Sequence, residues 1–360
     1  MNLTKTPATV VTGFLGSGKT TLLSNIVKQA GNKRIAIIVN EFGETDIDSD
    51  LLRSCAIEGC EENSGDVTLL EDGIYELPNG CICCTVEEEF LPVMKKLVAR
   101  RNEIDHVLIE TSGLALPKPL VQAFNWPEVK SHFTVDSVIT VVDGPALSEG
   151  RFAHSHEQIE NQRQADESLD HDPSIQELFE DQLGAADLII ISKNDLVDAD
   201  KRTIIEDQLR AQLKESVKII GIENGEINPE LILGLEAASE DRIESLHSHH
   251  DHHHQHGKHH HHAHDDFDSI VISLGLVDSD ILLQQLDRVI ASHNIYRAKG
   301  FVALEGKPMR QVVQAVGSRV EHYFDRPWKM DETPRTEIVV IGKQLDVAQI
   351  QATLKIAELS

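Results

Sequence analysis

The chain has 360 residues, of which 40% are hydrophobic and only 4% aromatic, and its formal net charge is −27. Because one hydrophobic core seldom grows beyond about 250–300 residues, the length predicts two domains. The negative charge excludes nucleic acid and anionic membrane surfaces as expected partners, and the lack of a long apolar run or an apolar signal core predicts a cytoplasmic protein.

The first predicted strand, residues 9–12, ends in the motif G-x-x-x-x-G-K-T at residues 13–20. Apolar residues at helical spacing follow the motif. Strand, glycine loop and helix in this order are the context that a phosphate-binding P-loop requires. The loop N–H groups and the positive end of the helix would bind phosphate. The residues expected to contact the nucleotide here are Gly13, Gly16, Ser17, Gly18, Lys19, Thr20 and Thr21.

Two side chains of this loop have specific predicted roles. Lys19 is expected to neutralise the β- and γ-phosphates during hydrolysis and to face solvent when no nucleotide is bound. The Thr20 hydroxyl is expected to bind Mg²⁺.

A second buried strand is predicted over residues 35–39, followed by the acidic loop N-E-F-G-E-T-D at residues 40–46. Such a loop can act as a switch that approaches Mg²⁺ and the γ-phosphate only when both are present. Glu41, Glu44 and Asp46 are candidates to position water or to complete the metal shell, with Glu41 the catalytic candidate and Glu44 the candidate metal ligand. An ordinary solvated loop is the alternative.

Three of the five cysteines lie within four positions, as C-x-C-C at Cys81, Cys83 and Cys84. Thiolates prefer Zn²⁺, Co²⁺ or Cu⁺ to Mg²⁺, so the motif predicts a transition-metal site. Buried, inert cysteines are the alternative. Cys55 and Cys60 have a spacing that fits no standard zinc pair, and a structural or incidental role is expected for them.

After a helix predicted over residues 87–101, a strand over 106–109 ends in E-T-S-G. A carboxylate at a strand end with a glycine three residues later is typical of the second P-loop motif. Glu110 would hold a Mg²⁺-bound water, and the N–H of Gly113 would sense the γ-phosphate. A strand over 135–142 and an acidic helical stretch over 149–187 come next.

The strand predicted over residues 188–191 is followed by Ser192-Lys193-Asn194-Asp195, close to the guanine signature N-K-x-D. Asp195 would accept hydrogen bonds from N1–H and the 2-amino group of guanine, and adenine lacks the second of these. Lys193 belongs to the same predicted site, so the expected nucleotide is GTP. Ser192 departs from the usual Asn, which braces this loop.

Residues 247–264 contain 12 of the 19 histidines and have no periodic apolar face. Neutral imidazoles bind Zn²⁺, Co²⁺, Ni²⁺ and Cu²⁺, so this tract is an auxiliary metal-binding candidate, with a solvated spacer as the alternative. The sequence thus predicts an α/β P-loop domain with a mostly parallel sheet over residues 1–235, a His-rich flexible linker over 236–266, and a small α+β domain over 267–360.

The C-terminal domain is expected to alternate strands and helices. Its predicted strands cover residues 270–274, 298–304, 311–316 and 338–341, and its predicted helices lie over 281–290 and 347–359.

Together these motifs resemble the CobW family of P-loop GTPases over nearly the whole chain. Beyond the nucleotide motifs, the C-terminal half matches in Y-R-A-K-G-F (296–301), V-Q-A-V-G (313–317) and D-R-P-W (325–328). Residues 110–121 and 55–60 look like the members that act in cobalamin synthesis.

The resemblance implies a GTP-hydrolysing metallochaperone that delivers Co²⁺ to a client, the cobaltochelatase, and that could dimerise with GTP. A zinc chaperone of the same family is the nearest alternative. A metal store or sensor with incidental GTPase activity is another, and a P-loop kinase leaves Asp195 and C-x-C-C without a task.

Overall fold

A computed structural model describes residues 3–40, 69–70, 74–77, 90–153, 174–234, 267–330 and 332–359, with the backbone alone at 40, 69–70 and 74–77. The chain divides into two compact units. The first comprises residues 5–213 and 219–227, and the second comprises residues 1–4, 214–218 and 228–360. No helix within the described ranges is long and apolar enough to cross a membrane.

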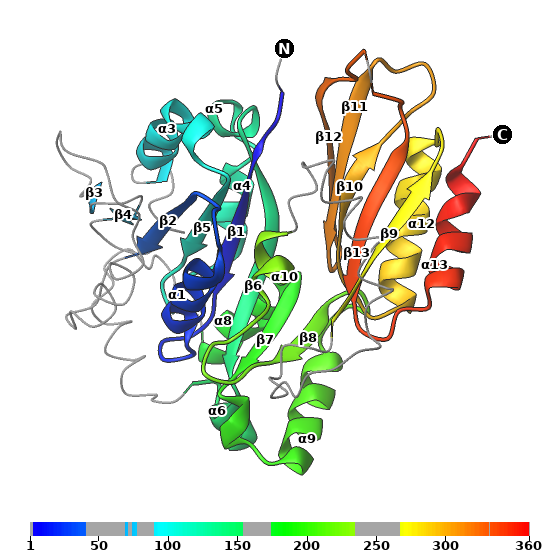
Figure 1. Ribbon diagram of the computed structural model, residues 1–360. Helices are drawn as coiled ribbons and strands as arrows, with labels where there is room; N and C mark the ends of the chain where they lie inside the picture. Colours follow the sequence, from blue (N-terminus) through cyan, green and yellow to red (C-terminus); the bar gives the residue numbers. More distant parts are fainter. Residues whose placement is uncertain are drawn as a thin grey trace, which may run out of the picture. The chain divides into compact units, whose positions relative to one another are not determined.

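The first unit is built on an eight-stranded sheet whose order is β3-β4-β2-β5-β1-β6-β7-β8 (Figure 1). The pairs from β4 through β7 are parallel, and β3 is antiparallel to β4. Runs of Val and Ile suit strands that are buried on both faces, and every residue of β6 is buried. The strands are β1 (Thr6–Thr12), β2 (Ile35–Asn40), β3 (Leu69–Leu70), β4 (Ile74–Leu77), β5 (His106–Glu110), β6 (Phe133–Asp143), β7 (Leu188–Ser192) and β8 (Lys218–Gly221).

Helices connect these strands because parallel neighbours need crossover segments. One core cluster packs Phe90, Met94 and Leu97 from the α3 region, with Leu120 and Phe124, against the inner strands. The helices here are α1 (Lys19–Gln29), α3 (Leu91–Ala99), α4 (Pro117–Ala123), α5 (Pro127–Lys130), α6 (Gly144–Ser148), α8 (Ile175–Ala185) and α9 (Ala199–Arg210), with short 3₁₀ turns η2 (Arg101–Glu103) and η3 (Asn194–Leu196).

The second unit holds a five-stranded antiparallel sheet with the order β12-β11-β10-β13-β9. Helices α12 and α13 lie together against it (Figure 1), and Leu282, Leu286, Ile350 and Leu354 pack into its core. The elements are α10 (Pro229–Leu233), β9 (Asp268–Leu274), α12 (Ser279–Ser292), β10 (Ile295–Val302), β11 (Met309–Val316), β12 (Arg319–Pro327), β13 (Thr336–Gly342), α13 (Val347–Leu354) and η5 (Lys355–Ala357).

The predicted α/β and α+β fold classes are confirmed, but some elements differ from expectation. The final helix ends at Leu354, before η5, and α3 ends at Ala99 rather than at residue 101. Strand β12 and helix α9 were not predicted. Buried and exposed side chains do not alternate clearly along β12, because most of its residues are only partly buried.

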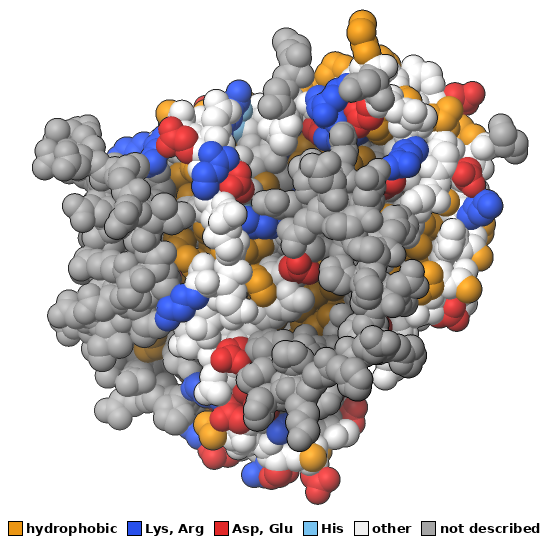
Figure 2. All heavy atoms as spheres, in the orientation of Figure 1, with side chains coloured by type: hydrophobic (Ala, Val, Ile, Leu, Met, Phe, Trp, Pro, Cys, Tyr) orange, Lys and Arg blue, Asp and Glu red, His pale blue; other side chains and the backbone are white. Residues whose placement is uncertain are grey.

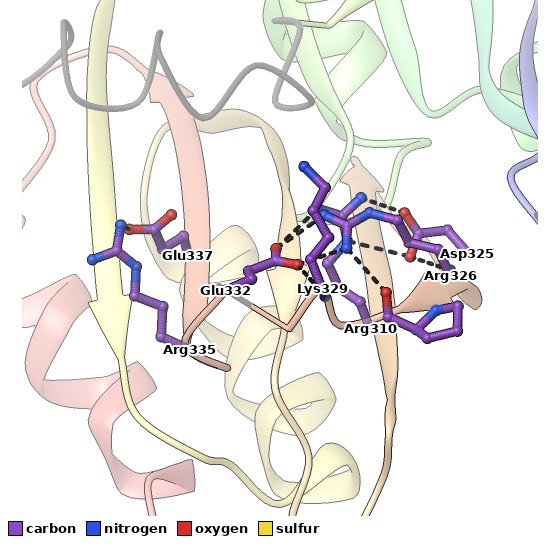
Figure 3. Close-up of polar contacts among 8 residues, drawn as sticks. Arg310, Asp325, Arg326, Lys329, Glu332, Arg335 and Glu337 are labelled. Carbon is purple, nitrogen blue, oxygen red and sulfur yellow. Dashed lines mark hydrogen bonds and ion pairs between the residues drawn. The ribbon is translucent and has the colours of Figure 1, made fainter.

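A cluster of ion pairs holds Asp325 and Arg326 of the D-R-P-W motif in the second unit (Figure 3). Asp325 accepts hydrogen bonds from Arg310, whose guanidinium lies 3.5 Å from the ring centroid of Phe301. Arg326 forms a bidentate pair with Glu332, with its shorter contact at 2.6 Å. Burial raises the pKa of Glu332, but hydrogen bonds from Arg326 and the Lys329 N–H and the nearby charges outweigh it and lower that pKa to about 2.

Surface charge is mixed on the face that Figure 2 shows, where acidic and basic side chains of the described residues are interspersed.

Candidate functional site

The glycine loop between β1 and α1 has the backbone geometry of a phosphate cradle. Gly13 has φ of 138°, and a Cβ there would lie 2.1 Å from the Val141 carbonyl oxygen, so no other residue fits. Gly18 adopts φ of 93° and places the N-terminus of α1 directly after the loop. The orphan N–H groups of a helix N-terminus attract anions.

Lys19 does not face solvent, which makes that expectation wrong. Its side chain is buried, and Nζ donates to the carbonyl oxygens of Gly13 at 2.8 Å and Phe14 at 3.2 Å. The physical reason is that the curled loop presents carbonyls to the ammonium group. The lysine therefore already lies along the loop where phosphates are expected.

The predicted Mg²⁺ residues Thr20 and Glu110 lie together. The Thr20 hydroxyl donates to Oε1 of Glu110 at 2.9 Å. The pairing follows from topology: β1 and β5 are parallel neighbours with Val11 opposite Glu110, so their carboxyl ends meet. A hydroxyl and a carboxylate are hard oxygen donors, and this donor set fits Mg²⁺.

The loop after β5 contains Gly113, the predicted γ-phosphate sensor, which is buried. The N–H of Thr111 donates to the Val11 carbonyl at 3.0 Å, so the β1–β5 ladder continues one residue past Glu110. The loop therefore begins beside the end of β1, the strand that leads into the glycine loop.

The residues predicted to recognise the base follow β7 directly. Lys193 adopts φ of 53°, and its Nζ donates to the Gly16 carbonyl at 2.8 Å and to Oδ2 of Asp143 at 2.6 Å. Asp195 is exposed on η3. Ser192, which stands where the motif usually has Asn, donates to the Val142 carbonyl and lies beside Gly18.

Sequence reasoning missed two features of this site. Asp143 is buried at the end of β6, where it accepts from the Ala146 N–H and from Lys193. The loop after β8 also joins the site. The N–H of Asn194 donates to the Ile222 carbonyl, and Asn25 of α1 donates to the Asn224 carbonyl. The signal available in the sequence was position, since Asp143 ends β6 and the other loop follows β8.

Thr21 and Ser17 complete the set of predicted loop residues. Thr21 is exposed on α1 beside Gly225, and Ser17 is buried, with its N–H donating to the Phe14 carbonyl.

The residues of the predicted switch and transition-metal sites lie outside the described residues. Glu41, Glu44, the three cysteines Cys81, Cys83 and Cys84, the pair Cys55 and Cys60, and the tract 247–264 all fall there. Within the described ranges, no group of three or more His, Cys, Asp or Glu side chains could hold a metal ion.

The described strands nevertheless fix where two of these segments start. Asn40 of β2 and Leu77 of β4 are register partners in parallel strands, and β2 also pairs with β5. Adjacent strands are about 4.8 Å apart. The segments at 41–68 and 78–89 therefore leave the same sheet edge that carries Thr20 and Glu110, within about 15 Å of the P-loop strand.

Two family models match the chain. Residues 7–221 match the family described as CobW/HypB/UreG, nucleotide-binding domain, and residues 271–358 match the Cobalamin synthesis protein cobW C-terminal domain.

Similar proteins cover nearly the full length. The chain is 50% identical over 355 residues to a Pseudomonas aeruginosa protein named Zinc chaperone CobW, covering 99% of this chain and 92% of that protein. It is 46% identical over 355 residues to a Sinorhizobium sp protein of the same name, covering 98% and 97%. A solved structure of Zn(II)-bound YjiA GTPase from E. coli is 24% identical and covers 99% of this chain and 100% of its own, with a TM-score of 0.42.

Proposed function

The chain belongs to the CobW/HypB/UreG family of P-loop GTPases, and on that premise we propose that it is a metal chaperone that uses GTP hydrolysis to load and release a transition metal for a client protein. Zn²⁺ is the first cargo to test, because the relatives at 46% and 50% identity are named zinc chaperones.

One observation carries the proposal. The segments that contain the acidic loop and C-x-C-C both leave the sheet edge at which Thr20 and Glu110 meet. A change at the γ-phosphate would therefore occur near the point where the chain segments expected to bind metal begin.

Each residue of the nucleotide site has a proposed task. Lys19 neutralises the phosphates, Gly113 senses the γ-phosphate, and Lys193 and Asp195 hold the guanine base. The Thr20 hydroxyl, and Glu110 through water, would hold Mg²⁺, which would supply positive charge to neutralise the phosphates.

The metal-binding tasks rest on chemistry at residues outside the described ranges. Cys81, Cys83 and Cys84 supply the soft donors that a transition metal prefers. Glu41 positions the attacking water, Glu44 completes the metal shell, and residues 247–264 capture metal as an auxiliary site.

A second cargo is Co²⁺, delivered to cobaltochelatase. It is favoured by the match of residues 271–358 to the cobalamin synthesis protein domain. A GTP-dependent dimer and a cytoplasmic location are also proposed.

The test is a metal titration at two nucleotide states. A variant lacking residues 247–264 is titrated with Co²⁺ as a spectroscopic probe, with Mg²⁺ and either a non-hydrolysable GTP analogue or GDP. The GTP analogue should order the switch before the metal binds. Metal affinity should then be roughly 5–150-fold higher than with GDP, which is a typical coupling between two sites. Thiolate-to-cobalt absorption measures this.

Two results discriminate the alternatives. Equal metal affinity in both nucleotide states would indicate a metal store. Retention of the absorption band in Cys83→Ser and Cys84→Ser, with its loss in Cys55→Ser or Cys60→Ser, would move the metal to the other cysteine pair. Metal analysis of the protein isolated with the GTP analogue bound then separates Zn²⁺ from Co²⁺ as cargo.

A further inference from the structure

The side chain of Gln182, on α8, holds the loop after β5. Gln182 is fully buried, and its Nε2 donates to the carbonyl oxygens of Gly113 at 3.2 Å and Ala115 at 3.1 Å. Its own backbone carbonyl accepts from the Thr140 hydroxyl of β6 at 2.9 Å. One amide therefore ties two carbonyls of an irregular loop to the centre of the sheet.

Helix α8 also contacts the glycine loop. The ring of Phe179 stacks on Phe14 with 6.1 Å between centroids and 9° between planes, and Phe152 packs against Phe179. The next position to Gln182, Asp181, pairs with Lys118 at the start of α4. This helix thus touches the P-loop at one side chain and the loop after β5 at another.

Burying a glutamine side chain here lowers the stability of the fold unless its hydrogen bonds compensate. Within the described part of the chain, Oε1 of Gln182 accepts no hydrogen bond. A buried acceptor without a donor lowers stability, and an apolar residue of similar volume would avoid that cost. Glutamine at this position is therefore better explained by its two hydrogen bonds to the loop than by packing in the core.

We propose that Gln182 is a positioning residue that preorganises residues 111–116 for the γ-phosphate and thereby sets how strongly the protein prefers GTP over GDP. The inference rests on the proposed nucleotide role of Gly113. Without the clamp, the loop must be ordered when the triphosphate binds, which weakens triphosphate binding more than diphosphate binding.

The experiment compares Gln182→Leu with Asp181→Asn, a control on the adjacent exposed position of the same helix. Affinities for a non-hydrolysable GTP analogue and for GDP are measured by calorimetry with Mg²⁺ present. We expect Gln182→Leu to shift the ratio of the two Kd values toward GDP by at least about fivefold. Asp181→Asn should leave that ratio unchanged. Preference for guanine over adenine should be unchanged in both, because Asp195 is untouched.

If Gln182 had a purely structural role, Gln182→Leu would lower the Tm and weaken the binding of both nucleotides by the same factor. That result would overturn the inference. If Gln182→Leu does not fold, Gln182→Asn is used, because its shorter side chain keeps polarity but cannot reach both carbonyls. Hydrogen exchange at residues 111–116 should then be faster than in the wild-type chain. A wild-type chain that binds no guanine nucleotide would overturn the proposed function itself, whereas wild-type binding with an unchanged ratio in the variants overturns this inference alone.

Discussion

The hydroxyl of Thr20 donates a 2.9 Å hydrogen bond to the carboxylate of Glu110, although 90 residues separate the two in the chain. Thr20 lies in the first turn of α1 and Glu110 ends β5, and they meet because β1 and β5 are parallel neighbours. The pair occupies the edge of the sheet where the glycine loop begins.

Glu110→Gln should weaken the dependence of GTP binding on Mg²⁺. The amide can still accept from Thr20, but it loses the charge that attracts a Mg²⁺-bound water. Changes at such supporting residues typically cost roughly 10–100-fold in metal affinity. GTP Kd values measured over a range of Mg²⁺ concentrations check this. Thr20→Ser, which keeps the hydroxyl, is the control, and an unaltered Mg²⁺ dependence in Glu110→Gln would contradict the assignment.

Lys19→Ala should abolish tight GTP binding and leave the fold intact. Two charge-assisted hydrogen bonds to phosphate contribute about 3–6 kcal/mol, so the Kd should rise by at least about 100-fold. Isothermal titration with GTP and a thermal melt measure the two effects. Lys28→Ala, at an exposed position of the same helix, is the control. Unchanged affinity in Lys19→Ala would refute the P-loop assignment.

Asp195→Asn should reverse the choice of base. The amide opposes the N1–H and 2-amino donors of guanine with a donor of its own, whereas the 2-oxo group of xanthine can accept from it. Competition between GTP and xanthosine triphosphate checks the reversal, with Asp200→Asn as an exposed control nearby. A variant that still prefers GTP would mean that Asp195 does not contact the base.

Glu332→Gln should destabilise the C-terminal unit at neutral pH but not in strong acid. The folded pKa of Glu332 is lowered from its ordinary value of 4.5 to about 2, so its contribution is fully present above about pH 4.5 and is lost as the pH falls through about 2. Each pKa unit corresponds to about 1.4 kcal/mol, which bounds the contribution at about 3 kcal/mol.

Urea unfolding of the full-length chain in a Trp126→Phe background would report this through Trp328. The free energies of unfolding of wild type and Glu332→Gln should differ at pH 7 and converge near pH 2. Glu337→Gln is the control, because its partner Arg335 is exposed and such pairs contribute about 0–1 kcal/mol. A difference that persists at pH 2 would contradict the charge-based explanation.

The amino-acid sequence alone determined the elements whose cause is local. Gly13 and Gly18 mark the loop because only glycine accepts their backbone geometry, and the apolar runs of β5 and β7 mark buried strands. The polar residues that follow those strands could therefore be assigned to one edge of a parallel sheet.

Tertiary structure alone decided which of those residues touch. Asp143 and Lys193 are 50 positions apart, and Gln182 and Gly113 are 69 apart, so no local pattern relates them. Lys19 lies on loop carbonyls rather than in solvent, because the curvature of the loop brings Gly13 and Phe14 to its ammonium group. Strand β12 escaped prediction for a similar reason. Its Asp325 pairs with Arg310 of the neighbouring strand β11, and its Arg326 pairs with Glu332, six residues further along the chain. Ion pairs of this kind leave no hydrophobic period in the sequence.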